Sequence, residues 1–527
     1  MAAMAVDRLF ERRIAGLINS REQRLLARGP RGVERESLRV NPDGGIAQTP
    51  HPRGLGSALT NAHVTTDYAE ALTELVTPTF EDNPALMHYL TDLHQFVYNK
   101  LGEELLWASS MPCVLHGESD VPIAVYGRSH QARVKSVYRH GLMIRYGGVM
   151  QAISGVHFNY SLPAQFWPLY AEICQSHDAR RDFVSASYFD LLRNYRRHGW
   201  LISYLFGCSP ALCRSFLQDR SDAGLETLGS DTLIGPDATS LRMSDIGYCN
   251  RGQTEVPVSV NHIDEYLRDL HRAIAQPHPP FAALGVKVDG EYQQLSANLL
   301  QIENEYYSYI RPKRTLRAGE RTLHALARGG VEYVEVRALD NGVFDPVGVN
   351  ERKLYFLEAF VQLLLLKASP PIDAGEEEAI DRNHLVVARR GRERGLTLTR
   401  DGREVSMQVW ALELLDSMQG ICECLDAGLP ERPYAAALRE QTAKLEDVAR
   451  TPSARLLAEL RQQDECFSTL TLRHSADHRR QIELQPPNAV RQDEFEQEAH
   501  ESLDAQGRLE ASQRGTFDEY LDAYLGV

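Results

Sequence analysis

Apolar residues along this chain recur with two different spacings, which predict both helices and strands. In residues 84–107 they recur every three or four positions, directly after Asp82 and Asn83, which are typical helix-capping residues. The same spacing predicts further helices over 182–205, 261–275, 351–368, 408–425 and 434–448, and over an acidic stretch, 491–524. Residues 369–391 contain a Pro pair, a glycine and an acidic run, so we predict an internal loop there.

Four short segments between these helices alternate polar and apolar residues, the period expected of strands with one buried face. In 32–40 the alternation places Glu34 and Glu36 on one face. In 155–161 it places His157 on a polar face with Asn159, and 300–307 and 333–337 repeat the pattern. We therefore predict an α+β protein whose strands each carry one polar face.

These polar faces allow two interpretations. An antiparallel sheet can simply lie at the surface, where water covers its polar side. The polar residues here are Glu, His, Asn, Arg and Tyr, however, with few of the Lys and Thr residues of a solvated strand, which favours a curved sheet around a polar cavity. Neighbouring carboxylates such as Glu34 and Glu36 repel each other unless cations neutralise them, and hard divalent cations prefer oxygen ligands. This points to magnesium or manganese.

A further acidic group occurs in residues 65–78. If this segment is helical, Asp67, Glu70 and Glu74 share one face, but the same pattern is typical of a solvated helix surface. His157 is equally ambiguous, because a histidine among carboxylates is more often a hydrogen-bonded core residue than a metal ligand. A metal role for these residues requires that the fold bring them to the carboxylates of the strands.

Composition and charge exclude several classes of protein. The 527 residues include 57 Lys and Arg against 72 Asp and Glu, a net charge of −15 that excludes a basic nucleic-acid binder. The N-terminus lacks the apolar stretch of a signal peptide. The most apolar run, 355–368, contains Glu358 and Gln362 and is shorter than the roughly 20 residues that span a bilayer. We expect a cytoplasmic protein without a membrane segment.

The 8 cysteines include no CxxC pair and no zinc-like spacing with histidine, so we expect free thiols in a reducing compartment. The sequence also lacks a Walker A motif, a complete dinucleotide fingerprint, a GxSxG elbow and an HExxH pair. Magnesium together with arginines, here Arg139, Arg242 and Arg337, is typical of phosphoryl transfer. If ATP binds, we expect it at a metal-rich sheet rather than at a phosphate loop.

Six segments, in this order, carry a resemblance to one enzyme family: RGVERESLRVNPDG (31–44), GSALTNAHVTTDYAEALTELVTP (56–78), SGVHFNYSLP (154–163), ATSLRMSDIGY (238–248), LQIENEYYSYIRPKR (300–314) and GGVEYVEVRALD (329–340). Together they resemble the proteobacterial type of glutamate-cysteine ligase. The resemblance implies a single catalytic unit over 1–527, with a ligase core at 25–350 and a mainly helical C-terminal region at 370–527. It also implies a funnel-like, mainly antiparallel sheet related to that of glutamine synthetase and surrounded by helices.

The resemblance implies ATP-dependent joining of the L-glutamate γ-carboxyl to the L-cysteine amine through a γ-glutamyl phosphate, the first step of glutathione biosynthesis. The positions that match the family's magnesium ligands are Glu34, Glu36, Asp67, Glu74, His157 and Glu335. Arg139 and Arg337 match positions that contact the transferred phosphoryl group, and Arg242 matches a substrate-carboxylate position. The amino-acid pocket matches Tyr138, Gln151, Tyr248 and Tyr307. Manganese could replace magnesium, glutathione is an expected feedback inhibitor, and we expect a monomer.

Two alternatives stay open at this point. The chain could keep the ATP chemistry and use another amine, as a glutamine-synthetase-like enzyme does with ammonia. It could instead be a metal- or effector-binding scaffold without turnover, which a missing essential carboxylate would favour. At the level of these motifs no such carboxylate is missing.

Overall fold

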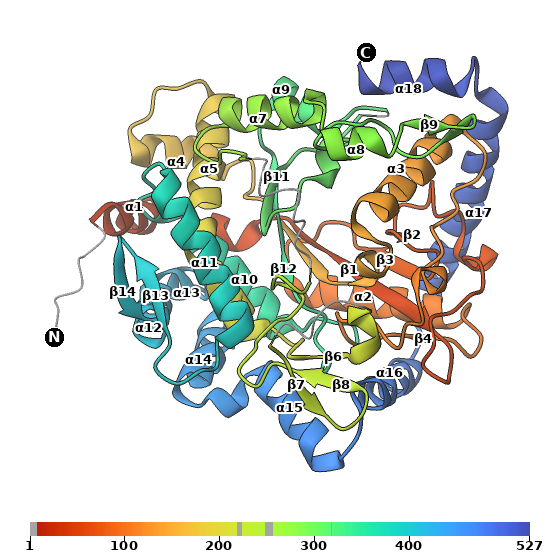
Figure 1. Cartoon of the computed structure of the whole chain (residues 1–527). Helices are drawn as coiled ribbons and strands as arrows, with labels where there is room; N and C mark the ends of the chain where they lie inside the picture. Colours follow the sequence, from red (N-terminus) through yellow and green to blue (C-terminus); the bar gives the residue numbers. More distant parts are fainter. Residues whose placement is uncertain (1–7, 219–223, 248–256, 318, 527) are drawn as a thin grey trace.

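The computed structural model combines many helices with antiparallel sheets, as the predicted α+β class requires (Figure 1). It describes residues 8–218, 224–247, 257–317 and 319–526. Tyr248 and Cys249, both singled out in the sequence, lie outside the described residues.

A seven-stranded sheet forms the centre of the fold, in the order β11-β12-β5-β1-β3-β2, with β4 paired to β1. All its pairings are antiparallel. The strands are β1 (Arg31–Val40), β2 (Val64–Thr66), β3 (Leu72–Val76), β4 (Leu105–Leu106), β5 (Val156–Tyr160), β11 (Ile310–Lys313) and β12 (Tyr333–Leu339). Three of the predicted strands, β1, β5 and β12, are therefore neighbours near the middle of the sheet.

In the acidic segments, the predicted strand at 300–307 is wrong, and the helix considered for 65–78 does not form. Residues 300–307 form no strand, and a 3-10 turn, η7 (Glu303–Glu305), stands in its place. Its carboxylates are buried and paired with distant arginines, Glu303 with Arg321 and Glu305 with Arg145, so the segment folds to meet these partners. Residues 65–78 form no helix but the hairpin of β2 and β3, because β3 completes the hydrogen bonding of β1.

Within the described ranges, three smaller sheets of two or three strands lie outside the central one. Their strands are β6 (Ala211–Cys213), β7 (Glu226–Leu228), β8 (Thr232–Ile234), β9 (Lys287–Val288), β10 (Glu291–Tyr292), β13 (Thr397–Arg400) and β14 (Arg403–Ser406).

A helix forms in every segment where the sequence predicts one, but the first and last residues differ from the predicted bounds. The first predicted helix, α2 (Asn83–Tyr98), begins at the Asp82 cap and ends before Gly102, whose φ is +59°. The apolar residues beyond Gly102 belong to β4 instead. The other helices before residue 370 are α1 (Arg8–Asn19), α3 (His130–Tyr146), α4 (Phe166–Cys174), α5 (Arg180–His198), α6 (Trp200–Phe206), α7 (Ile263–Ala275), α8 (Pro279–Ala283), α9 (Thr322–Gly329) and α10 (Glu351–Leu366).

The predicted loop at 369–391 is wrong, because residues Ala374–Arg390 form helix α11. Asp373 caps it by accepting a hydrogen bond from the Glu376 backbone N–H. The acidic run lies in its first turn and two arginines lie in its last, both favourable positions in the field of the helix dipole. Its buried face includes Ile380 and Val387, so the Pro pair precedes the helix rather than excluding it.

The C-terminal helices lie against the N-terminal part of the chain. In Figure 1 the blue helices α16 and α17 flank the red and orange strands, and Gln95 of α2 donates hydrogen bonds to the carbonyls of Ile482 and Gln485. These helices are α12 (Met407–Ser417), α13 (Gln419–Leu425), α14 (Pro433–Glu446), α15 (Pro452–Gln463), α16 (Phe467–Glu483), α17 (Ala489–Ser512) and α18 (Phe517–Leu525).

Two further findings concern the cysteines and the apolar helices. The cysteines within the described residues are all free thiols. In the same part of the chain, no helix combines the length and the apolar character needed to cross a bilayer.

A buried ion pair joins the central sheet to α10. Arg31, at the start of β1, donates to Glu358 over 2.6 Å, and both side chains are at most 1% exposed. Tyr434 of α14 donates its hydroxyl to the second oxygen of Glu358, at 2.7 Å. The carboxylate of Glu358 therefore connects β1, the buried helix α10 and the C-terminal helix α14.

We predict that Glu358→Gln lowers the free energy of unfolding by about 3 kcal/mol, because it leaves the buried Arg31 guanidinium without its counter-charge. Urea denaturation measures this change. The control is Glu81→Gln, in the exposed pair of Arg28 and Glu81, where the expected loss is under about 1 kcal/mol. Equal losses in the two variants would contradict the prediction.

Candidate active site

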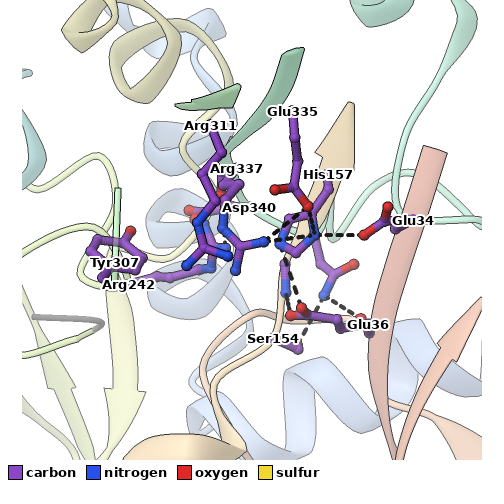
Figure 2. Close-up of polar contacts among 12 residues, drawn as sticks. Glu34, Glu36, Ser154, His157, Arg242, Tyr307, Arg311, Glu335, Arg337 and Asp340 are labelled. Carbon is purple, nitrogen blue, oxygen red and sulfur yellow. Dashed lines mark hydrogen bonds and ion pairs between the residues drawn. The ribbon is translucent and has the colours of Figure 1, made fainter. Parts of the chain in front are cut away.

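The pairing of β1, β5 and β12 brings Glu34, His157 and Glu335 together (Figure 2). Glu34 stands opposite His157 in the register of β1 and β5, and Glu335 stands opposite Asn159 in that of β12 and β5. The His157 Nδ1 atom lies 3.0 Å from Glu34 and 3.6 Å from Glu335. One ligand atom from each of the three residues lies within 4.8 Å of the others. We call these three residues the carboxylate cluster.

Glu36 extends the cluster along β1. Its Oε1 atom lies 3.5 Å from His157 Nε2, and its Oε2 accepts a hydrogen bond from the Gly155 N–H at 2.8 Å. Asn159 donates to Glu34 at 2.8 Å. The imidazole of His157 therefore lies among three carboxylates, so the fold meets the condition that the sequence left open.

Charge in this region is only partly balanced. Burial disfavours the ionised form of Glu335, but Lys313 and Arg337 outweigh it and hold the pKa of Glu335 well below its usual range. Burial raises the pKa of Glu36, although His157 opposes the shift. Burial, with the charge of Glu34 nearby, raises the pKa of Glu74 well above its ordinary value. The site thus holds more carboxylates than its cations neutralise, a condition that a divalent cation relieves.

Asp67 and Glu74 approach the cluster from the β2–β3 hairpin. Glu74 stands opposite Glu36 in the register of β1 and β3. Asp67 begins the turn between β2 and β3, and its charge raises the pKa values of Glu36 and Glu74. Glu70, also in this turn, accepts the backbone N–H groups of His51 and Val125 instead, so its role is structural.

The residues present fit a divalent cation. In the described structure, the buried Oε2 of Glu335 accepts no hydrogen bond, and its nearest ionic partner is Lys313, at 3.7 Å. Carboxylate oxygens dominate the available donors, which suits magnesium or manganese. Glu34, Glu36, His157 and Glu335 could each supply a ligand atom, with Asp67 and Glu74 beside them.

Arginines line one side of the carboxylate cluster (Figure 2). Arg337 donates to Glu335 at 3.1 Å. Arg242 donates to the Arg337 carbonyl at 3.0 Å and lies 3.9 Å from Asp340. Arg139 of α3 is held by the Asp67 carbonyl at 2.5 Å, which places it at the hairpin that carries Glu74.

Only some of the residues predicted to line the amino-acid pocket lie near one another in the structure. The Tyr307 hydroxyl lies 3.5 Å from the sulfur of Met243, which also accepts from Arg242 at 3.0 Å. Tyr138 precedes Arg139 on α3, and Gln151 lies on the 3-10 turn η4 (Val149–Ala152) before β5. Within the described residues, no hydrogen bond joins the Gln151 side chain to the carboxylate cluster.

Several site residues were missed by sequence reasoning. Lys313 of β11 reaches Glu335, and burial, with Arg139 nearby, lowers the pKa of Lys135 on α3 to about 8. Asp340 accepts hydrogen bonds from the Cys208 N–H and from the hydroxyls of Ser209 and Ser240. The only signal for Lys313 was its place in the RPKR sequence before β12. Asp340 ends the segment GGVEYVEVRALD (329–340), but its partners lie about a hundred residues or more away, so its contacts could not be inferred from that segment.

A family model described as glutamate-cysteine ligase matches residues 14–387. The chain belongs to the glutamate-cysteine ligase family. Among its relatives, the glutamate-cysteine ligase of Pseudomonas putida strain KT2440 is 46% identical over 493 residues, 94% of each chain. That of Azotobacter vinelandii is 46% identical over 524 residues, 98% of each chain. The resemblance found in the six sequence segments is therefore confirmed.

Solved structures agree with this membership. The glutamate-cysteine ligase of Francisella tularensis in complex with AMP is 33% identical, with a TM-score of 0.89 over 95% of this chain and 98% of that chain. A bifunctional glutathione synthetase from Pasteurella multocida is 23% identical, with a TM-score of 0.71 over 89% of this chain and 55% of that chain, and shares the fold.

We predict that Glu335→Gln weakens binding of Mn²⁺ by at least about tenfold, the size of effect that loss of an outer-shell partner alone produces. Electron paramagnetic resonance of free Mn²⁺ measures the affinity. The exposed Glu332, just before β12, offers a control, since Glu332→Gln removes the same charge away from the carboxylate cluster. Equal Mn²⁺ affinity in the two variants would exclude the metal role of Glu335.

Proposed function

We propose that this protein is a glutamate-cysteine ligase, which uses ATP to join the γ-carboxyl of L-glutamate to the amine of L-cysteine. The observation that carries the proposal is the convergence of Glu34, His157 and Glu335 beside Arg337 and Arg242, in a chain of this family. The AMP in the Francisella relative supports ATP as the co-substrate. The product, γ-glutamylcysteine, makes this the first step of glutathione biosynthesis.

The reaction needs two transfers. A γ-carboxylate oxygen of glutamate first attacks the terminal phosphorus of ATP, forming a new P–O bond as the bond to ADP breaks. The free amine of cysteine then attacks the acyl carbon, the C–O bond to phosphate breaks, and inorganic phosphate leaves as the new amide nitrogen loses a proton. Phosphorylation turns a poor leaving group into a good one, so one difficult step becomes two easier ones.

The resemblance implies a role for each charged residue, and their convergence supports these roles. Glu34, Glu36, Asp67, Glu74, His157 and Glu335 are proposed to hold magnesium, or manganese in its place. The bound metal would neutralise and align the ATP phosphates. Arg337 and Arg139 flank this group and are proposed to contact the transferred phosphoryl group, where guanidinium donors match phosphate oxygens.

Substrate recognition is assigned to residues at the arginine side. Arg242, fixed by the carbonyl of Arg337 and by Met243, is proposed to bind a carboxylate of the amino-acid substrate. Tyr307 lies next to it, and Tyr138, Gln151 and Tyr248 are proposed to complete the pocket near the cysteine.

The finer predictions of the resemblance belong to the same proposal. They are a single catalytic unit whose core spans 25–350 and whose helical region spans 370–527, a funnel-like sheet related to that of glutamine synthetase, a cytoplasmic monomer, and inhibition by glutathione. Nucleic acid and membranes are not expected partners of an acidic chain of this kind.

Phosphate release from Mg-ATP tests the activity and the acceptor together. With glutamate present, we expect cysteine to support rapid release and ammonia to support little. Turnover that prefers ammonia would assign the chain to another glutamate-amine ligase activity. Absence of turnover with every amine tested would favour the scaffold interpretation.

A glycine tests the role of Arg242. A Cβ atom at Gly155 would lie 2.1 Å from Arg242 Nη2, so Gly155→Ala must displace this guanidinium. We expect the KM for glutamate to rise about tenfold or more, as for loss of a charged hydrogen bond. Gly32→Ala on β1 is the control, since its Cβ would meet nothing closer than 3.4 Å. An unchanged KM in Gly155→Ala would separate Arg242 from glutamate binding.

A further inference from the structure

A pocket of about 280 Å³ opens away from the carboxylate cluster, between helices α10, α14 and α15 and the loop that follows β12. Of the described residues that line it, none belongs to the carboxylate cluster. Its charged lining consists of Lys353, Lys444, Arg450 and Arg455 against the carboxylates Asp345 and Glu440. Arg450 is also paired with Asp447, which lies 3.6 Å away and outside the lining, so the four basic groups exceed the three nearby carboxylates by one, and the pocket is suited to an anion.

Lys444 contributes a buried ammonium group. The residue is 7% exposed, and its Nζ donates to the Leu205 carbonyl at 2.8 Å and lies 4.9 Å from the ring of Phe206. An ammonium has three donors, so this carbonyl satisfies only part of its capacity. Burial, with Lys353 nearby, lowers the pKa of Lys444 to about 7, while Glu440 and Asp345 act against the shift. An anion beside Lys444 would favour its charged form.

Arg455 presents a second underused donor group. Its guanidinium carbon lies 4.0 Å from the centre of the Phe344 ring, a cation–π contact that holds the group at the pocket. Among the described residues, no acceptor takes a hydrogen bond from this side chain. Lys353, in contrast, is already paired with Asp345 at 2.5 Å. Its ammonium group therefore adds positive charge to the pocket but is held in place by Asp345.

We propose that this pocket binds a phosphate group, free or as a small monoester, at a site separate from the catalytic one. A phosphate would favour the charged form of Lys444, and its oxygens match the ammonium of Lys444 and the donors of the Arg455 guanidinium. The volume lies near the lower end of known ligand pockets, roughly 300 Å³, which limits the occupant to a small molecule. The loop that supplies Asp345 begins with Asp340 and Asn341, and Asn341 donates a hydrogen bond to the backbone carbonyl of Glu36. The pocket and the active site therefore share this loop.

Calorimetric titration of the full chain with inorganic phosphate, without nucleotide, tests this site. We expect saturable binding that weakens about tenfold or more in Arg455→Ala and in Lys444→Met, because each removes a charged donor. Arg439→Ala is the matched control, an exposed arginine of α14 outside the pocket, and it should bind phosphate like the unmodified chain. Arg337→Met, in the catalytic site, should also retain binding.

A second titration, with glycerol 3-phosphate, distinguishes the two sources of the phosphate group, since tighter binding than that of inorganic phosphate assigns a monoester. Arg455 is exposed, so its variant is expected to fold even if Lys444→Met does not. The proposal is overturned if phosphate shows no saturable binding, or if Arg455→Ala binds it as tightly as the unmodified chain. It is equally overturned if Arg337→Met alone abolishes binding.

Discussion

Antiparallel pairing of three strands far apart in the sequence is the constraint on which this structure depends. β1 lies between β3 and β5, and β5 lies between β1 and β12. The carboxylates of Glu34 and Glu335, about 300 residues apart in the sequence, therefore lie close together on one face of the sheet. Because side chains alternate along each strand, one register fixes all of them, and a slip of a single residue would turn them to the opposite face. The buried pair of Arg31 and Glu358 fixes the start of β1 against the helices behind it.

The geometry of this sheet also explains why so many charges can be buried together. His157 and Arg337 each contact a carboxylate, but they leave Glu36 and Glu74 with raised pKa values. Such a surplus costs folding free energy unless a cation offsets it. The arrangement of these carboxylates therefore favours binding of a cation over stability of the fold alone.

Local pattern predicted much of this arrangement. The period of two in β1, β5 and β12 predicted both the strands and the polar face with Glu34, His157 and Glu335. Where partners are distant, the pattern failed: Glu303 and Glu305 looked like strand residues because Arg321 and Arg145 cannot be inferred from their neighbourhood. The prolines before α11 likewise predict a loop, but they precede the Asp373 cap and so do not interrupt the helix.

The packing of the C-terminal helices on the first strands has a consequence for synthesis on the ribosome. Ser57 donates its backbone N–H to Ser502, and Ala108 does so to Ser475, so the N-terminal hairpin region receives partners made several hundred residues later. Contacts of such sequence separation form slowly, and chains of this size pass through intermediates. Until α16 and α17 leave the exit tunnel, the residues of β1 to β4 that these helices cover stay exposed to solvent. A chaperone would find the largest exposed surface at this stage.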